Sequence, residues 1–192
     1  MNESSLRRDD APAADRLTVA DVEARIASGM MNPRERIELL HGELVGMAAK
    51  SARHEVVKNA VLALWYRACP AGYMLAPELK FRLSSDTFVE VDIVVYSEDI
   101  GLAGLAGDNV ALVVEIADES LNYDLGRKAR LYASFGVREI WVIDVEQRQV
   151  SVFRDPSAGA YRARLQHDGD VPIAPAFAPP EFALALGQLQ IN

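Results

Sequence analysis

Two acidic residues interrupt apolar runs of the kind that form buried strands. Asp92 lies within VEVDIVVY, residues 89–96, and Glu115 lies within LVVEIA, residues 112–117. An unpaired buried carboxylate costs several kcal/mol, so each acid needs a hydrogen-bond partner, a cation or a metal. Side chains alternate across a strand, so each acid points to one face of its strand. If the strands are neighbours and the faces agree, the carboxylates lie close together.

Two carboxylates at such a short distance repel each other unless a cation holds them. Mg²⁺ binds through one or two carboxylates and keeps waters for the substrate and the nucleophile. The acid pair therefore predicts a site for a divalent cation, Mg²⁺ or Mn²⁺, built from strands.

A lysine follows on the next segment, which has helical spacing. Leu125, Lys128, Tyr132 and Phe135 recur at the intervals of one helix face, so Lys128 is expected on the stripe that faces the core. There it could stabilise the negative charge of a phosphoryl transition state or orient an attacking water. The alternative is that Lys128 extends to solvent or pairs with Asp124, one turn earlier.

Two elements are expected at the start of the fold. A capping box at Thr18 predicts a short helix that Gly29 ends. Residues 36–47 predict a hairpin that turns at His41 and Gly42.

The remaining elements alternate between strands and helices. Ser51 caps a long helix to about Ala68, and His54 lies in its first turn on the apolar stripe. Strands are expected at 78–83, 88–96, 110–117, 139–145, 149–155 and 161–165, with a helix at 122–135. This order predicts an α/β or α+β fold with a central mixed sheet flanked by helices.

Length and composition predict a globular protein. The chain has 192 residues, of which 50% are hydrophobic, and we expect one domain over 16–192 after a disordered tail at 1–15. Its apolar runs are far shorter than the roughly 18 to 20 residues of a membrane span, so no membrane partner and a cytoplasmic location are expected. One cysteine and three dispersed histidines give neither an internal disulfide nor zinc-ligand spacing.

The formal charge of -8 argues against broad, nonspecific binding of nucleic acid, which depends on clustered lysine and arginine. An acidic protein can still keep a local basic groove. A carboxylate site that recruits a divalent cation also contributes to the negative sum.

Several segments resemble, in order and spacing, the Uma-type restriction endonuclease family, a domain long catalogued without known function in the PD-(D/E)xK nuclease superfamily. The resemblance runs from about Asp15 to Tyr161. The segments that carry it are LTVADVEARIASG, RIELLHGELVGM, SARHEVV, VDIVVY and VVEIADESLNYDLGRKARLYASFGVREIWVID.

The resemblance implies a restriction-endonuclease-like core and a role for each of five residues. Asp92 and Glu115 correspond to the metal-binding pair. Glu43 and His54 complete the polar wall of the site, His54 as a further candidate metal ligand, and Lys128 supplies the cationic group.

Two positions depart from the family pattern. Val91 stands where a proline usually precedes the strand aspartate, and Ala117 stands where the superfamily motif places lysine. The first change is mild, because the proline is not a ligand. The second makes Lys128, displaced to the following helix, the candidate for the missing lysine.

Structural interpretations of the same residues remain open. Glu115 could lie on a solvated strand face beside an arginine, and His54 could be a satisfied polar residue at the core edge. Glu43 could be a hairpin residue that pairs with Arg34 or Arg36.

The leading hypothesis is a Mg²⁺- or Mn²⁺-dependent endonuclease that cleaves nucleic acid, in the first place DNA, with a metal-activated water. A homodimer is expected, because a double-strand cut needs two sites. The alternative is a catalytically weak or inactive nuclease-fold module that acts in binding or as a structural protein. The acidic charge and Ala117 favour this alternative, whereas the presence of Asp92 and Glu115 opposes it.

Overall fold

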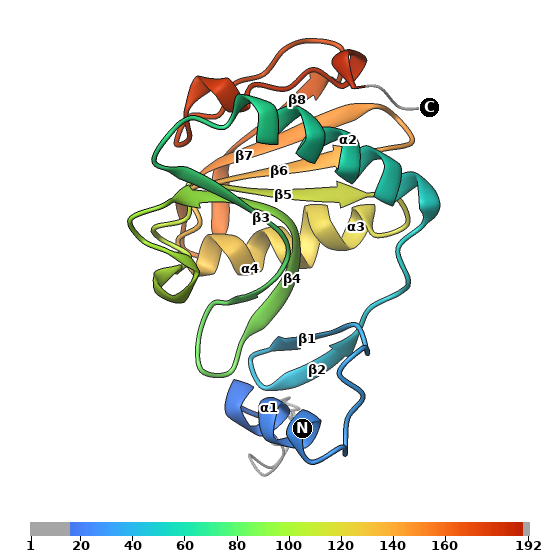
Figure 1. Cartoon of the computed structure of the whole chain (residues 1–192), viewed down its shortest axis with the longest axis vertical. Helices are drawn as coiled ribbons and strands as arrows, with labels where there is room; N and C mark the ends of the chain where they lie inside the picture. Colours follow the sequence, from blue (N-terminus) through green and yellow to red (C-terminus); the bar gives the residue numbers. More distant parts are fainter. Residues whose placement is uncertain (1–15, 190–192) are drawn as a thin grey trace, which may run out of the picture.

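A computed structural model describes residues 16–189, which form one mixed eight-stranded sheet with helices on both faces (Figure 1). The sheet order is β2-β1-β4-β5-β6-β7-β8, and β3 pairs with β4. The β5–β6 pair is parallel and the other pairs are antiparallel, which confirms the predicted mixed sheet. The strands are β1 Ile37–Leu40, β2 Glu43–Gly46, β3 Tyr73–Arg82, β4 Phe88–Ser97, β5 Leu112–Ala117, β6 Glu139–Asp144, β7 Gln149–Ser157 and β8 Ala160–Asp168.

Helices begin where the sequence places their caps. Thr18 and Asp21 form the predicted capping box, and Ser51 accepts a hydrogen bond from the backbone of His54. The helical elements are α1 Val19–Ala27, α2 Ala52–Ala68, and a continuous run of α3 Leu121–Tyr123, a π-helical turn at Asp124–Lys128 and α4 Ala129–Ser134. Figure 1 shows α2 on one face of the sheet and the α3–α4 run on the other.

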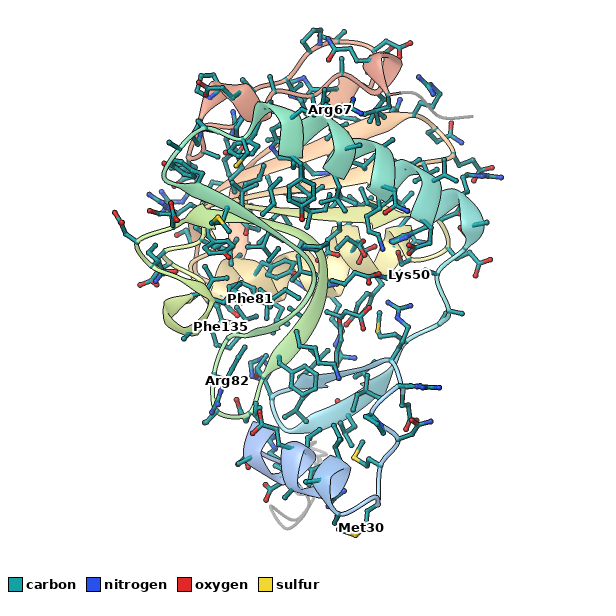
Figure 2. All side chains as sticks on the ribbon, in the orientation of Figure 1. Met30, Lys50, Arg67, Phe81, Arg82 and Phe135 are labelled. Carbon is teal, nitrogen blue, oxygen red and sulfur yellow. The ribbon has the colours of Figure 1, made fainter. Side chains whose placement is uncertain are left out.

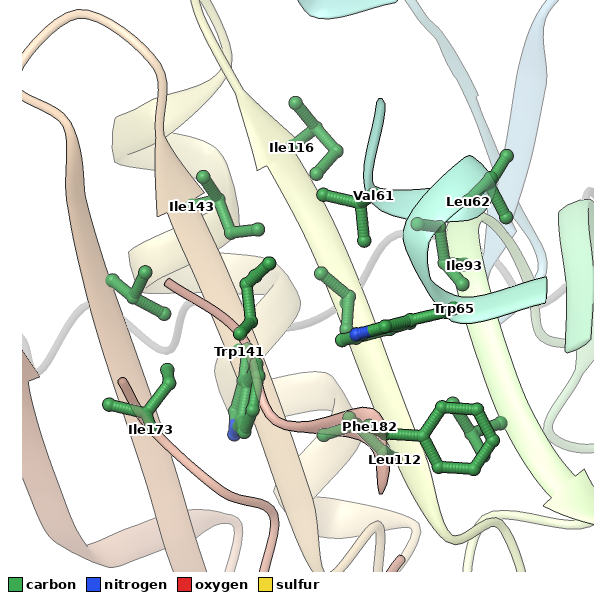
Figure 3. Packing of buried hydrophobic residues seen from close by; sticks show 14 of the residues in the cluster. Val61, Leu62, Trp65, Ile93, Leu112, Ile116, Trp141, Ile143, Ile173 and Phe182 are labelled. Atoms are coloured by element: carbon green, nitrogen blue, oxygen red, sulfur yellow. The ribbon is translucent and has the colours of Figure 1, made fainter. Parts of the chain in front are cut away.

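The core has two main layers, one on each face of the sheet. Under α2, Trp65 packs edge-on against Trp141 and Phe182 (Figure 3). On the opposite face, Val94 and Tyr132 belong to a second apolar cluster below α4. A smaller cluster joins α1 to β1 and the start of β4.

Strand β4 is shared between two neighbours on one edge. On the other edge β3 pairs with β4 along its length. On the shared edge, β5 pairs with residues 93–95 and β1 pairs at Phe88. Residues 89–92 therefore face a fork, where β1 and β5 diverge from β4.

Two elements differ from the sequence prediction. β3 begins at Tyr73, whereas the sequence predicts a start at residue 78. The difference includes Pro77, a residue type that usually interrupts a strand. It is tolerated here because β3 pairs only with β4, so the opposite edge needs no donor from Pro77. The helix predicted at 122–135 contains the π-helical turn, which the 3.6-residue period does not reveal.

Three further expectations concern the N-terminal tail, the number of domains and membrane spans. The tail predicted at 1–15 lies outside the described residues, and the single domain over 16–192 stays a prediction. Within residues 16–189, no helix is both long and apolar enough to cross a membrane.

Candidate active site

Acidic side chains fill the fork beside β4 and replace missing ladder hydrogen bonds. Glu38 Oε1 accepts from the backbone N–H of Glu90 at 3.1 Å, and Asp92 Oδ2 accepts from that of Ile116 at 2.8 Å. Buried backbone donors need such partners. The acids of β1 and β4 therefore hold the diverging strands together.

Asp92 is surrounded by donors on both carboxylate oxygens. Oδ2 also lies 3.0 Å from His54 Nε2, and Oδ1 lies 2.8 Å from Lys50 Nζ. Burial acts to raise the pKa of Asp92, but His54 above all, with Lys50 and Lys128, holds it well below its usual range. Asp92 is therefore an anion at neutral pH.

His54 is oriented by the start of α2. Its backbone donates to Ser51 Oγ at 3.0 Å, and its Nδ1 lies 3.2 Å from Glu55 Oε1. With both ring nitrogens beside carboxylates, His54 is arranged to position Asp92. Its predicted role as a metal ligand stays a prediction.

Glu115 lies near Asp92, on the adjacent strand β5. The paired register of β4 and β5 ends at Ile93 with Val114, next to both acids, and both acids line the same cavity. Glu115 lies 3.0 Å from Lys128 Nζ and accepts a hydrogen bond from the Tyr132 hydroxyl. Burial raises the pKa of Glu115 well above its usual value despite Lys128. Burial thus favours the protonated form of Glu115.

Lys128 is enclosed by acceptors. Its ammonium group donates to the Glu90 carbonyl at 2.7 Å and lies 3.2 Å from Glu38 Oε1, in addition to its contact with Glu115. Burial acts to lower the pKa of Lys128, but Glu115 and Glu38 raise it well above its usual value. Lys128 is a fully engaged cation below Asp92 and Glu115.

These groups open into a cavity of about 320 Å³. Six acidic and three basic side chains line it: Glu90, Asp92, Glu115, Asp118, Glu119 and Asp124, with Arg36, Lys50 and Lys128. The negative excess and the two buried carboxylates fit a Mg²⁺-type ion, which completes its shell with water. Within residues 16–189, no three His, Cys, Asp or Glu side chains form a ready metal cluster. The fit therefore rests on the Asp92 and Glu115 pair.

The structure brings together four of the five predicted site residues: His54, Asp92, Glu115 and Lys128. Glu43 lies elsewhere. Its side chain is 71% exposed on β2 and pairs with Arg127 at 3.3 Å, outside the residues that line the cavity. It is a hairpin residue with an arginine partner, although that partner is neither Arg34 nor Arg36.

Burial decides two of the structural alternatives. Glu115 has 2% of its side chain exposed, so the interpretation as a solvated strand residue beside an arginine is wrong. Lys128 has 4% exposed and does not extend to solvent, which confirms its predicted position on the core-facing stripe.

Three further residues contribute to the site and were absent from the sequence prediction. Glu38 is fully buried in IELL, which carries the same signal as Glu115, an acid within an apolar run. Tyr132 lies on the predicted helical stripe of Lys128, where it was assigned to the core. Lys50 lies in the loop before α2, where no periodic pattern could have indicated it.

The chain matches a family model over most of its length. The sequence profile of the Uma2 family, described as "Putative restriction endonuclease", matches residues 20–187. This match extends beyond Tyr161, where the resemblance noted in the sequence ended. No curated protein matches the chain.

A solved structure shares the fold of this chain. The crystal structure of "a putative nuclease belonging to DUF820" from Anabaena variabilis has a TM-score of 0.63 at 15% identity, over 89% of this chain and 96% of that chain. The likeness confirms the predicted nuclease-type fold. The type IIG restriction endonuclease BpuSI aligns over 71% of this chain and 16% of its own, at 11% identity and a TM-score of 0.38, too low for any argument.

Proposed function

Because the chain belongs to the Uma2 family, whose description is that of a restriction endonuclease, we propose that it is a metal-dependent endonuclease that hydrolyses phosphodiester bonds in DNA. The observation that carries the proposal is that two buried carboxylates, Asp92 and Glu115, line one cavity that has more acids than bases. Six acidic and three basic side chains line this cavity, an excess of acids that is expected of a site that takes up a divalent cation.

We assign the metal-binding role to Asp92 and Glu115. When bound there, Mg²⁺ or Mn²⁺ supplies a water of lowered pKa and positive charge for the phosphate. Within the protein, His54 and the Ile116 N–H fix Asp92 Oδ2. Tyr132 donates to Glu115 and fixes the direction of that carboxylate.

Lys128 contributes positive charge in the same region. Its ion pairs with Glu38 and Glu115 hold the ammonium group beside the carboxylates and keep it protonated. A fixed charge of this kind stabilises developing negative charge because it needs no reorganisation during the reaction.

Cleavage of both DNA strands requires two such sites, so the proposal includes a homodimer that acts in the cytoplasm. Glu43 is assigned no catalytic role, since it pairs with Arg127 outside the cavity.

The test is cleavage of supercoiled plasmid DNA with Mg²⁺ or Mn²⁺, with a folded RNA assayed in parallel. Removal of the charge by Glu115→Gln or Asp92→Asn is expected to reduce the rate at least about 100-fold, as for loss of a group that stabilises the transition state. Glu98→Gln is the matched control, because Glu98 is an exposed acid just beyond the end of β4. Circular dichroism checks that each variant is folded.

The alternative, an inactive nuclease-fold module, makes different predictions in the same series. It expects a folded wild-type protein that cleaves neither substrate and binds no Mn²⁺ in calorimetry. Two results together exclude this alternative: the wild type cleaves a substrate, and it binds Mn²⁺ in a way that Glu115→Gln abolishes.

A further inference from the structure

Lys50 lines the cavity and contacts Asp92. Its Nζ lies 2.8 Å from Asp92 Oδ1, 3.1 Å from Glu78 Oε1 and 3.3 Å from Glu90 Oε1. Figure 2 shows Lys50 between α2 and the β1–β2 hairpin. Three carboxylates from β3 and β4 thus surround one ammonium group.

The two oxygens of Asp92 have unequal roles. Oδ2 is already held by His54 and by the Ile116 backbone. Oδ1 is the remaining oxygen, and its partner is Lys50. A cation that binds Asp92 through Oδ1 therefore meets Lys50 first.

The backbone of β3 is distorted at the same point. Glu78 has φ of 52°, a left-handed conformation that is unfavourable for a residue with a side chain. The register places it opposite Asp92, between the pairs Pro77 with Ile93 and Leu79 with Val91. The strained residue supplies a second carboxylate to Lys50, as expected if this position is built to hold a cation.

The side chain of Lys50 can move away from Asp92 without disruption of a strand or helix. It lies in the irregular segment 47–51 between β2 and α2, and 11% of its side chain is exposed at the cavity. Lys128, in contrast, is fixed in the helical run by three acceptors.

We propose that Lys50 is an internal cation that occupies Asp92 in the metal-free protein and is displaced when a divalent metal binds. The inference rests on the proposed metal site and adds the residue that sets its affinity. Lys50 keeps the acids neutralised without metal, and the metal must compete with an ammonium group already in place.

The test is the affinity of the full chain for Mn²⁺ alone, measured by calorimetry for wild type, Lys50→Met and Lys50→Arg. A hydrogen bond between charged groups contributes about a tenfold factor or more to an equilibrium constant. Because Lys50→Met removes the group that competes with the metal for Asp92, the variant is expected to lower the Kd for Mn²⁺ by at least about tenfold. Lys50→Arg keeps the competing charge and should bind Mn²⁺ nearly as wild type does.

Lys58→Met is the matched control. Lys58 contacts the same Glu78 Oε1, at 2.5 Å, and also Glu55, but its ion pairs do not include Asp92. Its removal is expected to leave the Kd for Mn²⁺ within about twofold of wild type, since it does not compete for the metal-binding carboxylate.

A second measurement needs no variant. Acetylation of wild-type lysines, followed by mass spectrometry, should modify Lys50 severalfold faster with Mn²⁺ than with EDTA, whereas Lys58 keeps its rate. Should Lys50→Met fail to fold, an unchanged labelling rate of Lys50 upon Mn²⁺ binding would overturn the inference.

The outcomes separate this inference from the proposed function. Binding of Mn²⁺ that Glu115→Gln abolishes but Lys50→Met leaves unchanged would refute the role of Lys50 and retain the metal site. Absence of Mn²⁺ binding in wild type and Lys50→Met alike would refute the metal site itself, and the inference with it.

Discussion

At the scale of the residue, the partners of each buried acid decide its charge. Asp92 has two oxygens held by His54, Lys50 and a backbone donor, and it stays ionised. Glu115 shares Lys128 with Glu38, so burial raises its pKa. The site thus combines a permanent anion with an acid that a metal would help to ionise.

Asp124 is a third case, because burial raises its pKa to about 6, against the attraction of Lys128. A raised folded-state pKa means that the unfolded chain loses this proton at lower pH than the folded chain does. The free energy of unfolding is therefore reduced as the pH rises from about 4 to about 6, by roughly 3 kcal/mol in all.

Asp124→Asn should remove this pH-dependent loss. In EDTA we expect the variant to match the stability of wild type near pH 4. Above pH 6 it should be more stable than wild type by up to about 3 kcal/mol. Weakening of the hydrogen bond from Ser120 reduces this gain. Urea unfolding at pH 4 and pH 8 measures both proteins. An equal difference at the two pH values would contradict the explanation.

At the scale of the element, helix starts and strand ends aim the side chains of the site. The π-helical turn at Asp124–Lys128 buries both Asp124 and Lys128 on the side of the cavity. Ser51 has a double role at the start of α2, since its Oγ accepts from the His54 backbone and donates to Asp118 Oδ2 at 2.5 Å. The helix cap and the cavity wall therefore depend on one hydroxyl.

Ser51→Ala is expected to cost about 1 kcal/mol of stability, as for loss of a helix cap, and to reduce Mn²⁺ affinity because His54 is less well positioned. Thr18→Ala is the matched control, since Thr18 caps α1 away from the cavity. It should cost a similar stability and leave Mn²⁺ binding unchanged. Equal effects of both variants on Mn²⁺ binding would argue against a link between the cap and the site.

At the scale of the whole molecule, the segment after β8 completes the core under α2. Phe182 is fully buried, and its ring centroid lies 5.7 Å from that of Trp65. Trp65 and Trp141 are themselves fully buried in the same cluster (Figure 3). The C-terminal segment is thus part of the layer that keeps α2, and with it His54, in place.

Phe182→Ala is expected to reduce the free energy of unfolding by about 3 to 5 kcal/mol, because it leaves a cavity beside Trp65 and Tyr73. Urea titration followed by tryptophan fluorescence measures this change. Phe177→Ala in the same segment is the control, since Phe177 is 39% exposed and should cost far less. Similar losses for the two variants would show that Phe182 has no special part in the core.

The sequence alone determined the local features of the protein. Thr18 and Ser51 indicate helix starts, His41 and Gly42 indicate a tight turn, and both residues of that turn have positive φ. The strand patterns predict that Asp92 and Glu115 are buried acids, and the helical period predicts that Lys128 lies toward the core. These features depend on near neighbours in the chain, which a sequence shows directly.

Only the tertiary structure decided which groups meet in the cavity. Glu38 reaches Lys128 because β1 pairs with the first residue of β4, Phe88. Lys50 reaches Asp92 because the irregular segment 47–51, which has no hydrophobic periodicity, brings it to β4. Alternation tells the face of a side chain but not which strand or loop lies beside it. The fork beside β4, where the acids converge, is a consequence of long-range strand pairing, and the same pairing leaves Glu43 outside.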